Sequence, residues 1–551
     1  MPDNRRTVGK AAARKGDRVS TGSTREEGST REEGHNVEML FCQLVATSRA
    51  VAATSSRIAK RSALVELLSR LDSADDVEIA VAYLAGELRQ RRTGVGWATV
   101  ATMPAPATEP SLTLAEVDAA LERTSTLSGP GSAAARAAGV AELLRRATAD
   151  EQAFLRSLLL GDIRQGALDS AMLDAIASAS SIPLPVIRRA VMLRGATRPV
   201  AVAALMHGQP AVESFGLTVG QPVRPMLASS APDVAAAFAK LGPGSEAVID
   251  TKLDGIRVQV HKSGTDVRVF TRSLDDITSR LPEVVDLVRG LPAGDVILDG
   301  EALALDDTGR PRPFQETAAR TASSLDGQRG TSAAAVTPYF FDCLYADGES
   351  LIDLPLSERL LRLDAVVPAP SVAPRLVTTD TAAGSAFFAK TVAAGQEGVI
   401  VKAAAATYDA GRRGAGWIKV KPRHTLDLVV LAVEAGSGRR TGTLSNIHLG
   451  ARDPRDGSFV MLGKTFKGMT DEMLSWQTRR FLELETSRSG HVVHLRPEQV
   501  VEVAFDGLQR SSRYPGGLAL RFARVLRYRD DKSADEADTI DTVQKMAGRA
   551  D

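Results

Sequence analysis

From Leu40 to about Gly220, apolar residues recur at the spacing of amphipathic helices, and alanine is abundant. Within this segment Asp150 is placed to cap a helix that Gly161 ends. The apolar residues of that helix form one face, made by Phe154, Leu155, Leu158 and Leu159. The pattern therefore predicts an all-α domain, which we assign to residues 38–221.

After Leu227 the pattern changes to short β-branched runs separated by turns and a few helices. The runs are EAVID, RVQVH, VRVFT, DVILDGEALAL, YFFDCLY, GVIVK and WIKVK. They predict an α+β domain over residues 222–422, which opens at the linker GQPVRPML because proline does not continue a helix. Beyond it, LDLVVLAVEAG, SFVMLGKTF, HVVHL and VVEVAFDG predict an all-β domain over residues 423–532, consistent with a small barrel of the OB-fold type.

Both ends of the chain are polar. Residues 1–37 carry the tandem repeat STREEG and too few apolar residues to form a core, so they are predicted to be a disordered N-terminal tail. Residues 533–551 are predicted to be a polar C-terminal tail. No apolar run is long enough to cross a bilayer, and the charged start lacks the apolar stretch of a secretory signal, so we expect a cytoplasmic location and no membrane partner.

Composition narrows the picture further. The 551 residues are 44% hydrophobic and 25% charged, which is typical of a globular protein too long for one core. A net charge of +1 gives no overall basic field, so nucleic-acid binding would depend on local clusters of lysine and arginine. The two cysteines, Cys42 and Cys343, form no CxxC pair, which argues against a disulfide framework or a zinc ribbon.

The segment KLDG, which begins at Lys252 between two strand-like runs, is the first candidate for chemistry. A lysine amine attacks a nucleotide phosphate only in its neutral form, and neighbouring positive charges favour that form. Lys419 and Lys421 of WIKVK supply such charges on one face of a strand, because side chains alternate. Taken alone, a lysine before an Asp-Gly turn is more often a solvated hairpin residue. The hypothesis therefore depends on the charged segments that follow.

Three further residues complete the candidate pocket. Glu301 of LDGEAL and Glu397 of EGVIVK lie at predicted strand ends or turns, where their carboxylates would hold Mg²⁺. The alternative for each glutamate is an exposed turn residue. Phe341 of YFFDCLY would be a core residue in most proteins, but beside a nucleotide it would stack on a purine.

Six segments in this order resemble the nucleotidyltransferase motifs of bacterial ATP-dependent DNA ligases: KLDGIR, TRSLDD, LDGEAL, YFFDCLY, EGVIVK and WIKVKP. RFARVLRYRDDK resembles the basic motif of the C-terminal OB domain of that family, although Ala523 stands where the family commonly has proline. LLLGDIRQGALDSAML and RPMLA resemble the helical DNA-binding domain and its exit. The resemblance extends from Leu40 to Lys532 and implies a DNA-binding domain, an adenylation domain and an OB domain.

The resemblance also implies a role for each motif residue. Lys252 would form a lysyl-AMP phosphoramide, and Asp250 would contact the adenine side through its backbone. Arg257 and Arg272 would contact ribose and phosphate oxygens, and Glu301 would contact ribose or metal. Phe341 would lie against the adenine face. The phosphate contacts would come from Arg413, Lys419 and Lys421. Arg412 is an alternative to Arg413. The C-terminal motif, with Arg521, Arg524, Arg527, Asp531 and Lys532, would orient pyrophosphate.

The implied reaction uses ATP and Mg²⁺ and seals nicks in duplex DNA in replication, repair or recombination. Its steps are adenylation of Lys252, transfer of AMP to the 5′-phosphate of the nick, and attack by the 3′-hydroxyl. A monomer is expected, because three domains of one chain suffice to surround a duplex.

An NAD-dependent ligase is excluded, because its cysteine zinc module cannot be formed by two isolated cysteines. Three alternatives remain. They are an mRNA-capping guanylyltransferase, which would not require the long helical region; an RNA ligase, which would lack the OB-domain motif; and a catalytically silent DNA-binding scaffold.

Overall fold

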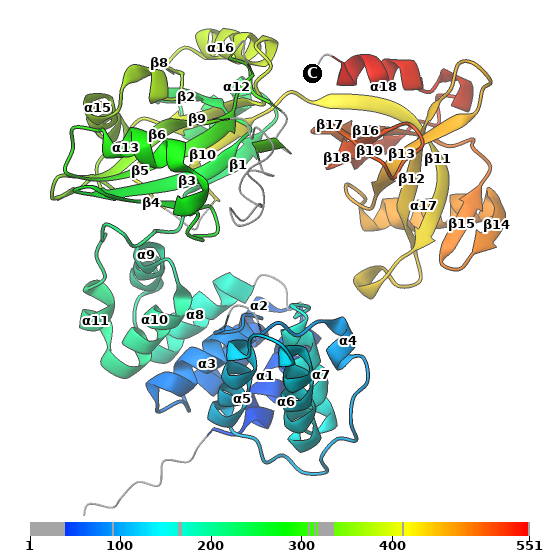
Figure 1. Cartoon of the computed structure of the whole chain (residues 1–551). Coiled ribbons are helices and arrows are strands. Elements are labelled where there is room, and N and C mark those ends of the chain that lie inside the picture. Colours follow the sequence, from blue (N-terminus) through cyan, green and yellow to red (C-terminus); the bar gives the residue numbers. More distant parts are fainter. Residues whose placement is uncertain are drawn as a thin grey trace, which may run out of the picture.

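The computed structural model describes residues 39–90, 93–163, 168–306, 309–312, 316–317, 335–409 and 413–548. Figure 1 shows three bodies, which we call the helical unit, the middle unit and the C-terminal unit. This order of a helical region followed by two sheet-containing regions confirms the predicted multi-domain fold class. The predicted tail over residues 1–37 lies outside the described residues, and the exact domain boundaries stay a prediction.

The helical unit is built around one apolar core. Its helices are α1 (Phe41–Ala53), α2 (Arg57–Leu68), α3 (Ala74–Leu84), α4 (Trp97–Val100), α5 (Leu114–Thr126), α6 (Ser132–Arg146), α7 (Ala149–Leu159), α8 (Leu168–Ser180), α9 (Leu184–Arg194), α10 (Thr197–Val202) and α11 (Gln209–Glu213), with a π-helical turn at Ala203–His207. Helix α7 begins two residues earlier than a cap at Asp150 requires, because Thr148 is the N-cap. The Glu151 carboxylate accepts hydrogen bonds from the Thr148 amide and hydroxyl at 2.8 and 2.9 Å. The prediction of Asp150 as the cap is therefore wrong.

The middle unit contains two five-stranded sheets. One has the order β1 (Leu227–Ala231), β10 (Arg413–Val420), β9 (Gly398–Ala403), β2 (Ala247–Lys252) and β8 (Arg375–Thr378). The other has the order β4 (Asp266–Thr271), β3 (Ile256–Ser263), β5 (Asp295–Ala304), β6 (Val336–Ala346) and β7 (Glu349–Ser350). The helices are α12 (Val234–Leu241), α13 (Pro282–Arg289), α15 (Leu356–Val366) and α16 (Thr381–Ala393), with 3₁₀ turns at Thr278–Arg280 and Ala369–Ser371. The chain passes from the first sheet to the second at residues 253–255.

The C-terminal unit is built on a seven-stranded sheet in which the long β11 (His424–Ala435) pairs with β12, β15 and β16. The remaining strands are β12 (Leu444–Arg452), β13 (Phe459–Thr465), β14 (Glu485–Ser489), β15 (Val492–Leu495), β16 (Val500–Phe505) and β19 (Arg524–Tyr528), with a separate hairpin of β17 (Gly507–Arg510) and β18 (Leu518–Arg521). The helices are α17 (Asp471–Glu483) and α18 (Ile540–Ala547), and 3₁₀ turns lie at Gly438–Arg440 and Ala534–Glu536.

Helix α18 corrects the prediction of a polar tail over residues 533–551. Its Ile540 and Val543 are buried and belong to the core of the C-terminal unit. These two apolar residues are three positions apart and share one helical face. The polar composition of the segment therefore did not reveal that it forms a short amphipathic helix.

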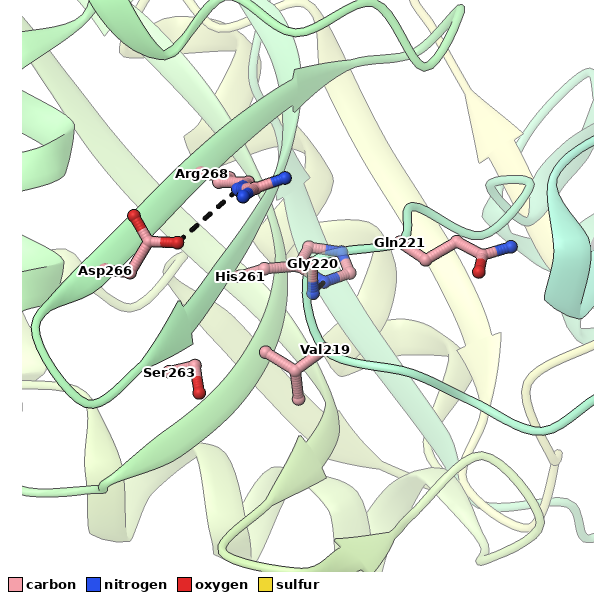
Figure 2. A pocket seen from close by; sticks show the side chains of 7 residues that line it. All are labelled: Val219, Gly220, Gln221, His261, Ser263, Asp266 and Arg268. Atoms are coloured by element: carbon pink, nitrogen blue, oxygen red, sulfur yellow. Dashed lines mark hydrogen bonds and ion pairs between the residues drawn. The ribbon is translucent and has the colours of Figure 1, made fainter.

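The linker from the helical unit is fixed to strand β3 (Figure 2). The Gly220 amide donates to His261 Nδ1 at 2.9 Å, and the Val223 amide donates to Gln259 Oε1 at 2.8 Å. Burial lowers the pKa of His261 to about 3, so the ring is neutral at physiological pH and can accept the Gly220 hydrogen bond. A cavity of about 200 Å³ lies beside this contact, and a 3.5 Å ion pair between Arg268 and Asp266 lines it.

Among the helices of the described part of the chain, none has both the length and the apolar character needed to cross a bilayer.

Candidate active site

A cavity of about 590 Å³ in the middle unit brings most of the predicted site residues together. We call it the lysine pocket. The predicted residues that line it are Asp250, Lys252, Arg257, Arg272, Glu301, Phe341, Lys419 and Lys421. Strand β10 begins at Arg413, whose backbone alone is described, and Arg412 lies outside the described residues.

The backbone around the lysine pocket is close-packed at two glycines. A Cβ at Gly255 would lie 2.3 Å from the Ala302 carbonyl oxygen, and one at Gly398 would lie 2.2 Å from that of Val420. Both distances are far below van der Waals contact, so only glycine allows these approaches. Gly398 also pairs with Lys252 across strands β9 and β2. Gly255 therefore allows the KLDG segment to approach β5, and Gly398 allows β9, the neighbour of β2, to approach the end of β10.

Glu397 pairs with two lysines of the pocket. The Glu397 carboxylate forms ion pairs with both Lys252 and Lys421. Burial acts to raise the pKa of Glu397, but the two lysines outweigh it, so this pKa is lowered. Glu397 was predicted from the sequence to hold a metal ion, whereas its contact with Lys252 was not predicted.

The pKa values of Lys419 and Lys421 are shifted in opposite directions. Burial, followed by the charges of Lys421 and Lys252, lowers the pKa of Lys419. For Lys421, burial acts in the same direction, but Glu397 and Asp506 outweigh it and raise the pKa. Lys419 therefore loses its proton more easily than an isolated lysine, whereas Lys421 is held as a cation.

Glu301 differs from Glu397 in its surroundings. Burial raises the pKa of Glu301 to about 7, although Lys252 and Arg257 act against this shift. A carboxyl group that titrates near neutrality is typical of functional pockets. Among the described residues no group of three or more histidine, cysteine, aspartate or glutamate side chains is arranged for a metal ion.

Arg257 is held mainly by the protein itself. Its guanidinium donates to both oxygens of Asp299 at 3.0 and 2.7 Å and to the Met226 carbonyl at 2.7 Å. The Tyr408 hydroxyl donates to the same aspartate at 2.8 Å. Three of the five guanidinium N–H groups are thus engaged. The ribose or phosphate contact implied for Arg257 depends on the remaining two.

The aromatic wall of the pocket contains a buried cation. Lys402 forms an ion pair with Asp250, and its ammonium lies 4.6 Å from the ring centroid of Phe341 and 4.1 Å from that of Trp417. Burial raises the pKa of Asp250, and Lys402 opposes this shift. Lys402, Trp417 and Asp299 were not predicted as site residues, although they lie in the motif segments EGVIVK, WIKVKP and LDGEAL.

Two ion pairs connect the C-terminal unit to the pocket. Lys421 Nζ lies 3.2 Å from Asp506 Oδ2, and Arg521 Nη1 lies 3.8 Å from Asp254 Oδ2. Of the predicted C-terminal motif, therefore, Arg521 is the residue that reaches the KLDG segment.

The other cations of that motif have partners within the C-terminal unit. Arg527 donates to Glu502 at 2.7 Å, and Lys532 donates to Asp427 at 2.6 Å. Arg524 is exposed at the start of β19, and Asp531 pairs with Arg529 at 2.7 Å. In this arrangement these residues do not face the lysine pocket.

Comparison with known proteins gives consistent matches along the chain. Family models match at three places: "DNA ligase N terminus" at residues 100–177, "ATP dependent DNA ligase domain" at 225–421 and "ATP dependent DNA ligase C terminal region" at 440–532. A "Probable DNA ligase" of Beutenbergia cavernae is 66% identical over 516 residues, covering 93% of this chain and 100% of the relative. One of Nocardioides sp. is 60% identical over 517 residues, with coverage of 93% and 100%.

A solved structure titled "Pmar-Lig_Pre." is similar in fold, with a TM-score of 0.59 at 19% identity, covering 88% of this chain and 99% of that one.

Proposed function

Because the chain belongs to the ATP-dependent DNA ligases, enzymes that seal nicks in duplex DNA, we propose that the lysine pocket is its adenylation site and that Lys252 carries the AMP. The observation that supports this assignment is the gathering of Lys252, Lys419 and Lys421 in one cavity, where Lys252 and Lys421 both pair with Glu397. Lys421 also pairs with Asp506, whereas Lys419 has no ion-pair partner among the described residues, so its charge is available to a triphosphate.

Each step is a transfer at phosphorus. In the first, Lys252 Nζ attacks the α-phosphorus of ATP, an N–P bond forms, the bond to the β-phosphate oxygen breaks and pyrophosphate leaves. In the second, an oxygen of the 5′-phosphate at the nick attacks the same phosphorus and Lys252 is released. In the third, the 3′-hydroxyl attacks the activated 5′-phosphate, a phosphodiester bond forms and AMP leaves.

The pocket residues have distinct parts in these steps. Lys419 and Lys421 would stabilise charge on the phosphate oxygens, a role suited to fixed cations in a partly buried site. Phe341 and Trp417 offer an aromatic wall for adenine, and the Trp417 indole nitrogen is buried with no hydrogen-bond partner among the described residues. That donor is available to a ligand.

The carboxylates of Glu301 and Glu397 suit Mg²⁺, which prefers oxygen ligands and is commonly shared with phosphates. When bound, Mg²⁺ would neutralise phosphate charge and compete with Lys252 for the Glu397 carboxylate. The proposal assigns both glutamates to this role, and Glu301 additionally to ribose.

We also infer the larger arrangement. The seven-stranded sheet organised around β11 fits an OB-fold. The three units of a monomer would surround a nicked duplex and bind mainly its phosphate backbone, so affinity should fall as salt rises. A cytoplasmic enzyme of DNA replication, repair or recombination is the setting that we propose.

The test combines protein, Mg²⁺ and α-labelled ATP or GTP. We expect acid-stable label from ATP that requires Lys252, together with sealing of nicked duplex DNA. Label from GTP alone would favour a capping guanylyltransferase, and the absence of label would favour a silent scaffold. The matched ligase family models and relatives favour neither of these alternatives.

A further inference from the structure

Lys421 lies between two carboxylates that come from different units. Glu397 belongs to the middle unit and precedes β9, whereas Asp506 belongs to the C-terminal unit and lies between β16 and β17. The Lys421 and Asp506 side chains are 20% and 42% exposed, so the pair is partly shielded from solvent and salt. This is the cation of the lysine pocket that touches the C-terminal unit.

The position of Asp506 is fixed by its neighbours. Its amide donates to the Arg521 carbonyl at 3.0 Å, which closes the β17–β18 hairpin. Arg521 in turn approaches Asp254. The two pairs between the units therefore have opposite polarity, with an anion and a cation on each side. Such an alternating pattern favours one docked orientation over others.

Lys421 is also part of the connection between the two units. Strand β10 ends at Val420 and β11 begins at His424, so residues 421–423 alone join the middle unit to the C-terminal unit (Figure 1). Any rotation of the C-terminal unit about this segment changes the surroundings of Lys421 directly. A carboxylate on the rotating unit is therefore well placed to control where this ammonium points.

Asp506 gives Lys421 a second anionic partner. Without Asp506, Lys421 has Glu397 as its anionic partner, and Glu397 is shared with Lys252. With Asp506 in place, Lys421 is also held from the side of the C-terminal unit. Asp506 also contributes to the raised pKa of Lys421, which keeps the ammonium charged.

We propose that Asp506 is a positioning residue, which holds Lys421 at the mouth of the lysine pocket for the two steps that involve DNA. The inference rests on the proposed function, because it assumes that Lys252 carries the adenylate. It assigns no contact with substrate to Asp506 itself. The formation of lysyl-AMP needs no DNA, and Lys421 keeps Glu397 of its own unit as a partner, so this step should depend little on Asp506.

The experiment separates the steps. Full-length wild-type protein, Asp506→Asn and Asp506→Glu are incubated with α-labelled ATP and Mg²⁺ to measure lysyl-AMP formation. The labelled proteins are then freed of ATP and mixed with nicked duplex DNA to measure sealing in a single turnover. Glu472→Gln is the matched control, because it removes an exposed carboxylate from α17 of the same unit.

We expect Asp506→Asn to form lysyl-AMP within about twofold of wild type and to seal about tenfold more slowly, since a small displacement of a positioned group costs one to two orders of magnitude. Asp506→Glu should restore most of the sealing rate, and Glu472→Gln should match wild type.

Equal loss of both activities in Asp506→Asn, unchanged sealing, or a defect that Asp506→Glu leaves uncorrected would overturn the inference. Absence of label in the wild-type protein would instead overturn the proposed function, on which the inference depends.

Discussion

The lysine pocket and the C-terminal basic motif are both rich in cations, but they differ in how those cations are matched. In the pocket, Lys252 and Lys421 share Glu397, Lys421 also pairs with Asp506, and Lys419 has no ion-pair partner among the described residues. In the C-terminal unit, Arg527 pairs with Glu502, while Arg529 and Lys532 pair with Asp427. The difference distinguishes an unmatched charge, which is available to a polyanion, from a matched charge that mainly holds the fold together.

Replacing Lys252 by alanine is the most severe test of the pocket side. We expect ATP labelling and nick sealing to fall by at least about 10⁴-fold, because no other group can form the covalent intermediate. Labelling with α-labelled ATP and a nicked-duplex assay measure both. Lys390→Ala, which removes an exposed lysine on α16, is the control. Retained labelling in Lys252→Ala would place the nucleophile elsewhere.

Glu301→Gln tests the cost of a buried carboxylate in the same pocket. The pKa of Glu301 is raised from 4.5 in the unfolded chain to about 7, so the native state binds its proton more tightly. This contribution to stability is complete below pH 4.5 and is lost as pH rises through 7. Above pH 7 the variant should therefore be more stable than wild type, by about 2 to 3 kcal/mol, while sealing more slowly.

Urea unfolding of the free enzyme at pH 5 and pH 8 measures this difference, with the exposed Glu358→Gln as control. The gain should be small at pH 5 and large at pH 8. An equal gain at both values would mean that burial does not govern the titration of Glu301.

Asp427→Asn tests the paired cations of the C-terminal unit. The side chain is 12% exposed and accepts hydrogen bonds from Arg529 at 2.9 Å and Lys532 at 2.6 Å. Loss of its charge should destabilise the C-terminal unit by about 1 to 2 kcal/mol. Hydrogen exchange of β11, followed by mass spectrometry, should become about 5- to 30-fold faster. If exchange is unchanged and lysyl-AMP formation falls instead, the motif acts on the pocket after all.

Arg527→Ala should have the smallest effect. Its pair with Glu502 joins two adjacent strands, and the arginine side chain is 63% exposed. Exposed pairs of this kind contribute little, so stability should change by less than about 1 kcal/mol. Labelling and sealing within about twofold of wild type are expected in the same assays. A loss above tenfold would show that Arg527 leaves Glu502 to contact substrate.

The sequence predicted positions on regular strands better than it predicted partners. Lys419 and Lys421 share a face because strand side chains alternate, and the structure places both in one pocket. The partners of Glu397 and Arg257 could not be predicted, because they lie on strands or loops that are distant in the chain. Helix ends were difficult for a similar reason, as Thr148 and Asp150 are both acceptable caps until the backbone selects one.

The contact between the Gly220 amide and the neutral ring of His261 has a consequence for how DNA enters. Since the ring stays uncharged throughout the physiological pH range, this joint should not loosen as the cell acidifies. The helical unit is thus attached rigidly to the middle unit. We expect the opening of the protein around a double helix to occur instead by movement of the C-terminal unit about residues 421–423.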